Sequence, residues 1–134
     1  MGTVSYSRRL TFLAEQDPDR PAITCGEQSL TRAELESAAN RLARDLASGG
    51  VKVGDMVTVA LPNSTGWYVA AAACWKIGAI PQPVSADLPE RELHAILELA
   101  NPSTVIGAAP ELARGRRTLP VGYQPEMSVS AVIV

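Results

Sequence analysis

The chain has 134 residues, of which 46% are hydrophobic and 19% are charged, a composition typical of water-soluble globular proteins rather than disordered or fibrous ones. This length supplies a modest core for one domain but not for two, so we expect residues 1–134 to form a single unit. The 12 basic and 14 acidic residues are mixed along the chain and leave a net charge of −2, which argues against a nucleic-acid partner.

Targeting signals are not visible in the sequence. The first residues, MGTVSYSRRLTF, lack the apolar segment and cleavage site of a secretory signal, and no later stretch is apolar over a membrane-spanning length. Cys25 and Cys74 form no CxxC motif, so we expect reduced thiols, with Cys74 in the core. These features predict a cytoplasmic protein without a membrane span.

The N-terminal part of the chain predicts a short helix and then a small hairpin. Ser7 to Glu15 has helical spacing of apolar residues and ends in the turn-rich segment Asp17 to Pro21. Two brief extended pieces, at 22–25 and 29–30, flank the turn residues Gly26-Glu27-Gln28.

The strongest helix signal begins at Thr31, which forms a capping box with Glu34 because each side chain reaches a free backbone amide of the first turn. Gly49-Gly50 ends this helix. One face of it is apolar at the helical period: Leu35, Ala38, Ala39, Leu42, Ala43 and Leu46.

From residue 56 onward, strands and helices alternate. Met56 to Leu61 is almost wholly apolar, as expected for a strand covered on both faces. Asn63 or Ser64 is expected to cap a helix that runs to about Ile77 and is deeply packed over Val69 to Trp75, before Gly78 ends it.

The next units are a proline-containing strand, a helix and a short strand. Ile80 to Val84 contains two prolines and is therefore expected at the margin of a sheet. Pro89 begins a helix that stops at Asn101-Pro102, and Thr104 to Ala108 forms the next strand. The strand starts near 56, 80 and 104 are evenly spaced by one βαβ unit, so the predicted fold class is α/β with a layered sheet.

The last part of the chain gives weaker signals. We expect a helical turn at 111–114, a loop at 120–125 and an apolar strand at 128–134. The basic run Arg114 to Arg117 lies among loop-forming residues and is interpreted as a solvated turn without a functional role.

Several kinds of catalytic site are excluded by missing motifs. The turn after the first buried strand reads Pro62-Asn63-Ser64-Thr65-Gly66, which lacks the glycines of a dinucleotide-binding loop. No GxxxxGK[ST] or GxSxG sequence is present. His94 is the only histidine, so no multi-histidine metal site can form, and a packing role is expected for it.

Acidic and aromatic side chains give no catalytic signal by themselves. The acid pairs Glu34/Glu36 and Glu90/Glu92 are interpreted as solvated helix faces. The aromatic residues Trp67, Tyr68 and Trp75 are interpreted as core, although Trp67, at the start of its helix, has the right position to line a cleft.

Three long stretches, taken in order, carry a resemblance to a known family. They are RPAITCGEQSLTRAELESAANRLARDLASGGVKVGD, VTVALPNSTGWYVAAAACWKIGAIPQPVS and LPERELHAILELANPSTVIG. Together they resemble the opening region of AMP-forming acyl-CoA synthetases and related acid-adenylating enzymes, over roughly Pro21 to Gly107. The resemblance implies that residues 1–134 are a partial N-terminal subdomain of the large domain of such an enzyme.

The resemblance also implies a two-step reaction for the complete enzyme. A carboxylic acid would be adenylated with ATP, assisted by magnesium, and then transferred to coenzyme A. The family's phosphate loop, ATP-binding motifs and C-terminal lysine have no counterpart in this sequence. We therefore expect no catalytic residue, no metal site and no cofactor in this chain, and no activity from it alone.

Three residues are candidates for lining the ligand cleft of the complete enzyme: Asn63, Ser64 and Trp67. They follow the carboxyl end of a predicted strand, where open α/β sheets place their ligands. Helix capping is the simpler explanation for Asn63 or Ser64.

Three functional hypotheses remain open. The first is part of a ligase that joins a carboxylic acid, in particular a fatty acid, to coenzyme A. The second is part of an amino-acid adenylation domain that loads a carrier protein, and the third is a non-catalytic α/β interaction module. Apolar surface that normally packs on the rest of the domain predicts a homo-oligomer.

Overall fold

A computed structural model describes residues 3–121 and shows six strands, four α-helices and one 3₁₀ helix in that range. In chain order they are α1 (Tyr6–Gln16), β1 (Pro21–Cys25), β2 (Gln28–Thr31), α2 (Arg32–Ser48), β3 (Met56–Val59), α3 (Thr65–Lys76), β4 (Ile80–Pro83), α4 (Glu90–Ala100), β5 (Thr104–Ile106), η1 (Pro110–Leu112) and β6 (Arg117–Leu119).

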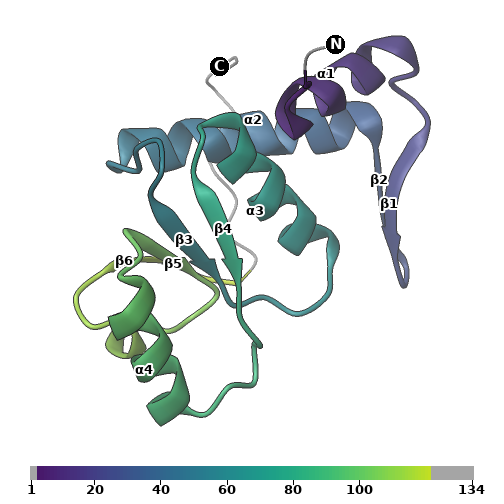
Figure 1. Ribbon diagram of the computed structural model, residues 1–134. Coiled ribbons are helices and arrows are strands. Elements are labelled where there is room, and N and C mark those ends of the chain that lie inside the picture. Colours follow the sequence, from purple (N-terminus) through teal and green to yellow (C-terminus); the bar gives the residue numbers. More distant parts are fainter. Residues whose placement is uncertain (1–2, 122–134) are drawn as a thin grey trace.

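The central sheet has four parallel strands in the order β4-β3-β5-β6. Met56 pairs with Ile80, Val57 with Thr104, and Thr104 with Arg117. Parallel neighbours need crossover connections, and here α3 and α4 supply two of them (Figure 1). The predicted α/β class with a layered parallel sheet is therefore confirmed.

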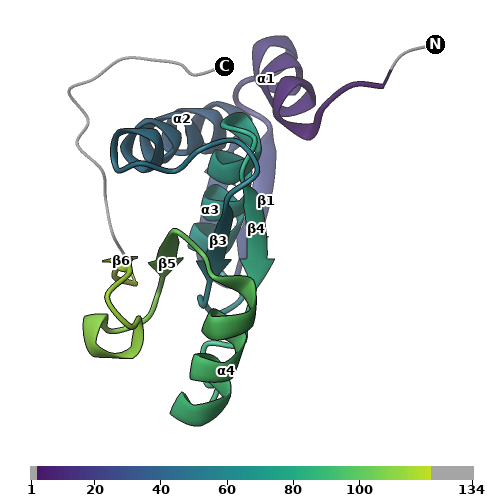
Figure 2. The same cartoon turned by 60° about the vertical axis from the view of Figure 1, so that its left-hand side comes forward.

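Helices cover both faces of this sheet (Figure 2). On one face α2 and α3 pack over the apolar side chains of β3, with Ile106 and Leu119 from the neighbouring strands completing the layer. On the other face α4 and η1 form a smaller cluster in which Leu93 and Leu97 meet Val105. The antiparallel β1–β2 hairpin stands apart from the sheet beside α2 and α3 (Figure 1).

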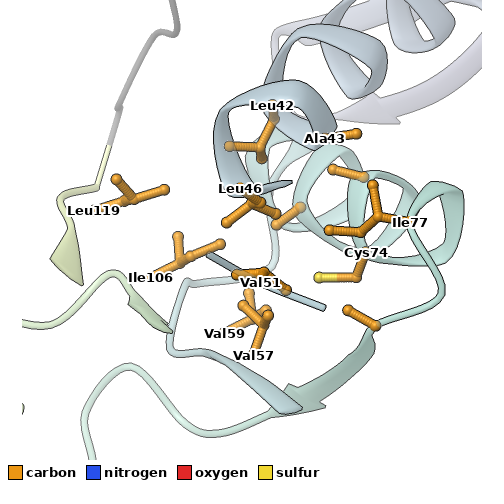
Figure 3. Packing of buried hydrophobic residues seen from close by; sticks show 13 residues of the cluster. Leu42, Ala43, Leu46, Val51, Val57, Val59, Cys74, Ile77, Ile106 and Leu119 are labelled. Carbon is orange, nitrogen blue, oxygen red and sulfur yellow. The ribbon is translucent and has the colours of Figure 1, made fainter. Parts of the chain in front are cut away.

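The main core consists of buried hydrophobic side chains that pack against one another (Figure 3). Leu46 of α2 and both Val57 and Val59 of β3 have no solvent exposure. Cys74 is also fully buried, as predicted, and burial raises the pKa of its thiol to about 12 because the thiolate would be desolvated. Ala70 to Cys74 are all buried, which confirms the deep packing predicted for α3 over these residues but not at Trp75, which is 38% exposed.

Helix ends follow the sequence signals closely. At the start of α2 the Thr31 side chain accepts from the Glu34 amide while the Glu34 carboxylate accepts from the Thr31 amide, so the predicted capping box is confirmed. Ser64, not Asn63, caps α3. At the end of α4, Asn101 adopts a left-handed conformation with φ 48°.

Edge strand β4 shows how proline is accommodated in a parallel sheet. Pro81 and Pro83 both lie within Ile80–Pro83, which pairs with β3 on one side and ends the sheet on the other. A proline has no amide to donate, but an edge strand needs only half of its amides for pairing. The predicted marginal position of this strand is confirmed.

The interpretation of Arg114 to Arg117 as a solvated turn was wrong for its second half. Arg117 begins strand β6, and its guanidinium pairs with Asp45 of α2 at 3.0 Å. Arg116 donates to the carbonyls of Leu97 and Pro102 and so satisfies the end of α4. Arginines can form an edge strand when their side chains reach partners across the fold, and the local sequence does not reveal such partners.

The expected helical turn at 111–114 is present as η1 (Pro110–Leu112), which begins one residue earlier and ends two residues earlier than expected. The predicted loop at 120–125 falls within the described residues only at 120–121, and the predicted strand at 128–134 lies outside them.

Candidate functional site

The carboxyl ends of the parallel strands meet along one edge of the sheet. The Ala60 amide donates to the Ile106 carbonyl at 2.8 Å, and the Gly107 amide donates to the Leu119 carbonyl at 2.7 Å. Gly107 has φ 95°, and a Cβ at this position would stand 2.5 Å from the Ala60 carbonyl oxygen. The chains after β3 and β5 are therefore in direct backbone contact, which only glycine permits here.

The three candidate cleft residues lie at this edge, in the turn between β3 and α3. The Ser64 hydroxyl donates to the Pro62 carbonyl at 2.9 Å and accepts from the Trp67 amide at 3.4 Å, so its observed role is helix capping. Asn63 is exposed, and within residues 3–121 its side chain makes no hydrogen bond. Its amide group is therefore available to a ligand.

Trp67 is half-buried, with its ring packed against the main core beside Leu61 and Val69. It also meets Tyr68 edge to face, with ring centroids 5.2 Å apart. The predicted core role is thus partly right for Trp67. It was wrong for Tyr68 and Trp75, which are 40% and 38% exposed.

The described part of the chain contains no set of groups that would hold magnesium. No three His, Cys, Asp or Glu side chains cluster between residues 3 and 121. The turn at 62–66 has one glycine, so its backbone does not form a phosphate cradle. The residues present at this edge therefore do not fit a metal–nucleotide complex by themselves.

The described residues also enclose a cavity of about 390 Å³, away from the candidate cleft residues. It lies between α1, the hairpin, α2 and α3, and none of Asn63, Ser64 and Trp67 lines it. Its walls are mostly apolar: Leu10, Leu13, Pro21, Ala22, Ile23, Leu35, Tyr68, Ala71, Ala72 and Trp75, with the charged residues Arg32 and Glu36.

A buried polar cluster joins three helices beside this cavity. The Lys76 ammonium lies 2.9 Å from one Glu36 carboxylate oxygen, and Thr11 donates to the other at 2.6 Å. The Lys76 side chain is only 5% exposed and that of Glu36 only 17%. The interpretation of Glu36 as a solvated residue was therefore wrong. The sequence contained one signal for this pair. Lys76 lies on a helix that is apolar nearly all round, and a buried lysine needs an anionic partner.

His94 has the packing role that the sequence suggested. Its side chain is 21% exposed, with Nε2 3.8 Å from a Glu90 carboxylate oxygen and Nδ1 3.2 Å from the Arg114 guanidinium. This arrangement links α4 to the segment after η1 and contains no nucleophile.

Comparison with known sequences assigns the family. The AMP-binding enzyme family matches residues 11–131, which is most of the chain. The chain belongs to the AMP-binding enzyme family. The broad resemblance to acid-adenylating enzymes is thereby confirmed, within a family that includes more than acyl-CoA synthetases.

One similar curated protein is named as a peptide synthetase: the chain is 30% identical over 100 residues to nonribosomal peptide synthetase 8 of Aspergillus fumigatus, covering 75% of this chain and 1% of that protein. The chain is 37% identical over 109 residues to malpinin synthetase of Mortierella alpina, covering 78% of this chain and 1% of that protein. It is 38% identical over 85 residues to surfactin synthase subunit 1 of Bacillus subtilis, covering 63% of this chain and 2% of that protein. The chain thus spans a very small part of these relatives.

Solved structures agree on the fold. An artificially fused adenylation–PCP di-domain, NpsA-ThdA from Klebsiella oxytoca, matches all of this chain with a TM-score of 0.81 and 21% identity. The NpsA N-terminal subdomain in complex with anthranilyl-AMSN matches 86% of this chain with a TM-score of 0.73 and 24% identity. This chain covers 27% and 30% of those two chains. Its fold is that of the N-terminal subdomain of adenylation domains.

Within residues 3–121, none of the helices has both the length and the apolar character needed to cross a bilayer.

Proposed function

We propose that this chain is the N-terminal part of the large domain of an amino-acid adenylation domain within a longer peptide synthetase. The observation that carries the proposal is the 30% identity over 100 residues to a protein named as a nonribosomal peptide synthetase. It favours the amino-acid alternative over the fatty-acid alternative, because a peptide is assembled from amino acids.

The reaction of the longer protein would proceed in two balanced steps. A carboxylate oxygen of the amino acid attacks the α-phosphorus of ATP, the bond to the leaving oxygen breaks, and pyrophosphate departs. The thiol of a carrier protein then attacks the acyl carbon, loses its proton to a base, and displaces AMP to leave a thioester. The ATP-binding and catalytic groups for these steps are not among the residues of this chain.

In this proposal the chain supplies scaffold and one margin of the ligand cleft. The turn that follows β3 stands at the carboxyl edge of the sheet, the usual place for ligands in open α/β folds. Asn63 offers an unused amide there, Ser64 fixes the turn by capping α3, and Trp67 presents a half-buried ring. We assign these three residues to the margin of the amino-acid and nucleotide cleft.

The deciding experiment is ATP–pyrophosphate exchange by the full-length gene product with a panel of amino, aryl and fatty acids. We expect exchange with one amino acid or a few related ones, and no transfer of the product to coenzyme A. Exchange confined to fatty acids, with acyl-CoA formed, would restore the acyl-CoA synthetase reading. No exchange with any acid would support the non-catalytic interaction module.

The cleft assignment has a matched pair of tryptophans for its test. Trp67→Phe should raise KM for the amino acid, while Trp75→Phe, on the far part of α3, should leave KM unchanged. Equal effects of the two substitutions on KM would remove Trp67 from the cleft.

We also propose that the 134-residue chain by itself associates through exposed apolar residues. Val53 is 81% exposed, Leu99 91% and Ile80 47%. Sedimentation velocity should show oligomers that grow with concentration, and Val53→Ser should reduce them. A monomer at every concentration would contradict this proposal.

A further inference from the structure

The cavity beneath α1 is separate from the carboxyl edge of the sheet and from the residues assigned to the ligand cleft. Its volume of about 390 Å³ falls in the lower part of the range usual for small-molecule sites, about 300–1,000 Å³. It opens between the N-terminal elements and α3, whereas Asn63, Ser64 and Trp67 stand outside it.

The shape of the cavity follows from one face of α3. Tyr68, Ala71, Ala72 and Trp75 recur at helical spacing and therefore lie on one stripe, all of them lining the cavity. The two alanines form a low floor, while the two aromatic residues stand at its ends, about 10 Å apart along the helix axis. Leu10 and Leu13 of α1 line the cavity from the opposite side.

The two charged side chains in the cavity wall differ in whether their hydrogen-bonding groups are already in use. Glu36 is occupied, because Lys76 and Thr11 take one carboxylate oxygen each. Arg32 is half-buried, and within residues 3–121 its guanidinium donates one hydrogen bond, from Nη1 to the Leu13 carbonyl at 3.1 Å. Because the Glu36 and Lys76 charges cancel, Arg32 contributes the remaining charge of the wall, and it has guanidinium donors to spare.

We infer that this cavity is a binding site for a small aromatic carboxylic acid, with the ring between the apolar walls and the carboxylate on Arg32. An aromatic ring fits over the two alanines, between the rings of Tyr68 and Trp75. A carboxylate matches the planar donor fork of arginine, which can hold both of its oxygens through two parallel hydrogen bonds. The inference concerns a second site and does not depend on the proposed adenylation activity.

The test uses three probes with one ring and different charges: indole-3-acetate, indole and tryptamine. Binding is followed on the ¹⁵N-labelled chain by the side-chain N–H signals of its two tryptophans, assigned with Trp67→Phe. Saturable shifts should be larger at Trp75, which lines the cavity, than at Trp67, which reaches it only through Tyr68. Indole-3-acetate should bind about two- to fivefold more tightly than indole, the gain expected from a half-exposed ion pair, and tryptamine more weakly than either.

Substitutions at two positions, Arg32 and Tyr68, separate the contributions of charge and ring contact to binding. Arg32→Gln should bring the affinity for indole-3-acetate down to that for indole, and Arg32→Lys should restore part of the difference. Tyr68→Ala, at an exposed rim position, should weaken all three probes. Arg91→Gln removes the same charge from an exposed position on α4 and should change nothing.

Four outcomes would overturn the inference. One is the absence of saturable shifts at millimolar probe, and another is shifts confined to Trp67. The third is that tryptamine or indole binds as tightly as indole-3-acetate. The fourth is that Arg91→Gln has the same effect as Arg32→Gln. Because none of these measurements uses ATP, failure here leaves the proposed adenylation function standing, and failure of pyrophosphate exchange leaves this site standing.

Discussion

The two sides of helix α3 are built in opposite ways. The side that faces the sheet is a dry layer in which α2, α3 and β3 leave no exposed side chain among Leu46, Val57 and Cys74 (Figure 3). The side that faces α1 has a cavity of about 390 Å³ and a buried ion pair. The first side derives its stability from close packing, whereas the second combines a smaller apolar cluster of Leu35, Ala39 and Ala72 with a few polar contacts.

A matched pair of leucines gives the largest expected contrast. Leu46→Ala empties a fully buried position of the sheet side and should lower the free energy of unfolding by about 3 kcal/mol, from lost transfer and a new cavity. Leu13→Ala on the α1 side should cost about 1 kcal/mol, because this half-buried side chain already borders empty space. Urea denaturation of both variants checks the difference, and equal losses would show that the two sides are packed alike.

Removal of the ion pair on the α1 side tests the same contrast between the two sides of α3. Lys76→Met leaves the Glu36 carboxylate without its cation in a nearly buried place and should cost about 2 to 3 kcal/mol. The double substitution Lys76→Met/Glu36→Leu should recover most of that loss, because no unpaired charge remains.

Urea denaturation measures these two changes, and amide hydrogen exchange should show the loss concentrated in α1. If the double variant is as unstable as Lys76→Met, the loss of stability does not come from the unpaired Glu36 carboxylate. The explanation of this side's stability by its polar contacts would then be wrong.

The sequence predicts the sheet side much better than the α1 side. The apolar period of α2, the continuous apolar run of β3 and the cap at Thr31 are local patterns, and each determines its element and its buried face. The Glu36–Lys76 pair joins positions 40 residues apart, and the Arg117–Asp45 pair joins positions 72 apart. Such pairs depend on how the helices are placed in space, so the local pattern of apolar and polar residues does not predict them.

The candidate site shows the same division. Ser64 was predictable as a cap because its partner amide is three residues away. The cavity was not, because its lining comes from α1, β1, α2 and α3 and exists only once these elements are packed. The exposure of Trp75 has the same cause, since α3 is apolar nearly all round and its sequence does not tell which face is left partly uncovered.

Glycine at the carboxyl edge provides a further contrast, within the sheet itself. Gly107→Ala combines a positive φ with a contact of 2.5 Å to the Ala60 carbonyl oxygen and should cost about 2 kcal/mol. Gly115→Ala has a similar φ of 82° but open space around the new methyl group, and should cost about 1 kcal/mol. Thermal unfolding of the two variants separates backbone strain from steric contact. Equal shifts in Tm would mean that the backbone after β3 moves aside freely.

The smallest expected effect concerns Ser64, where α3, the element shared by both sides, begins. Ser64→Ala removes the acceptor for the Trp67 amide and should lower the free energy of unfolding by about 1 kcal/mol. Asn63→Ala, one residue earlier, should leave it within about 0.5 kcal/mol, because this exposed side chain has no partner within residues 3–121. In the full-length protein the order should reverse for substrate affinity, since an unpartnered amide at the margin of the cleft is the group a ligand would use. If Asn63→Ala changes neither stability nor KM, the turn after β3 contributes only a helix cap, and the cleft must be formed by other parts of the protein.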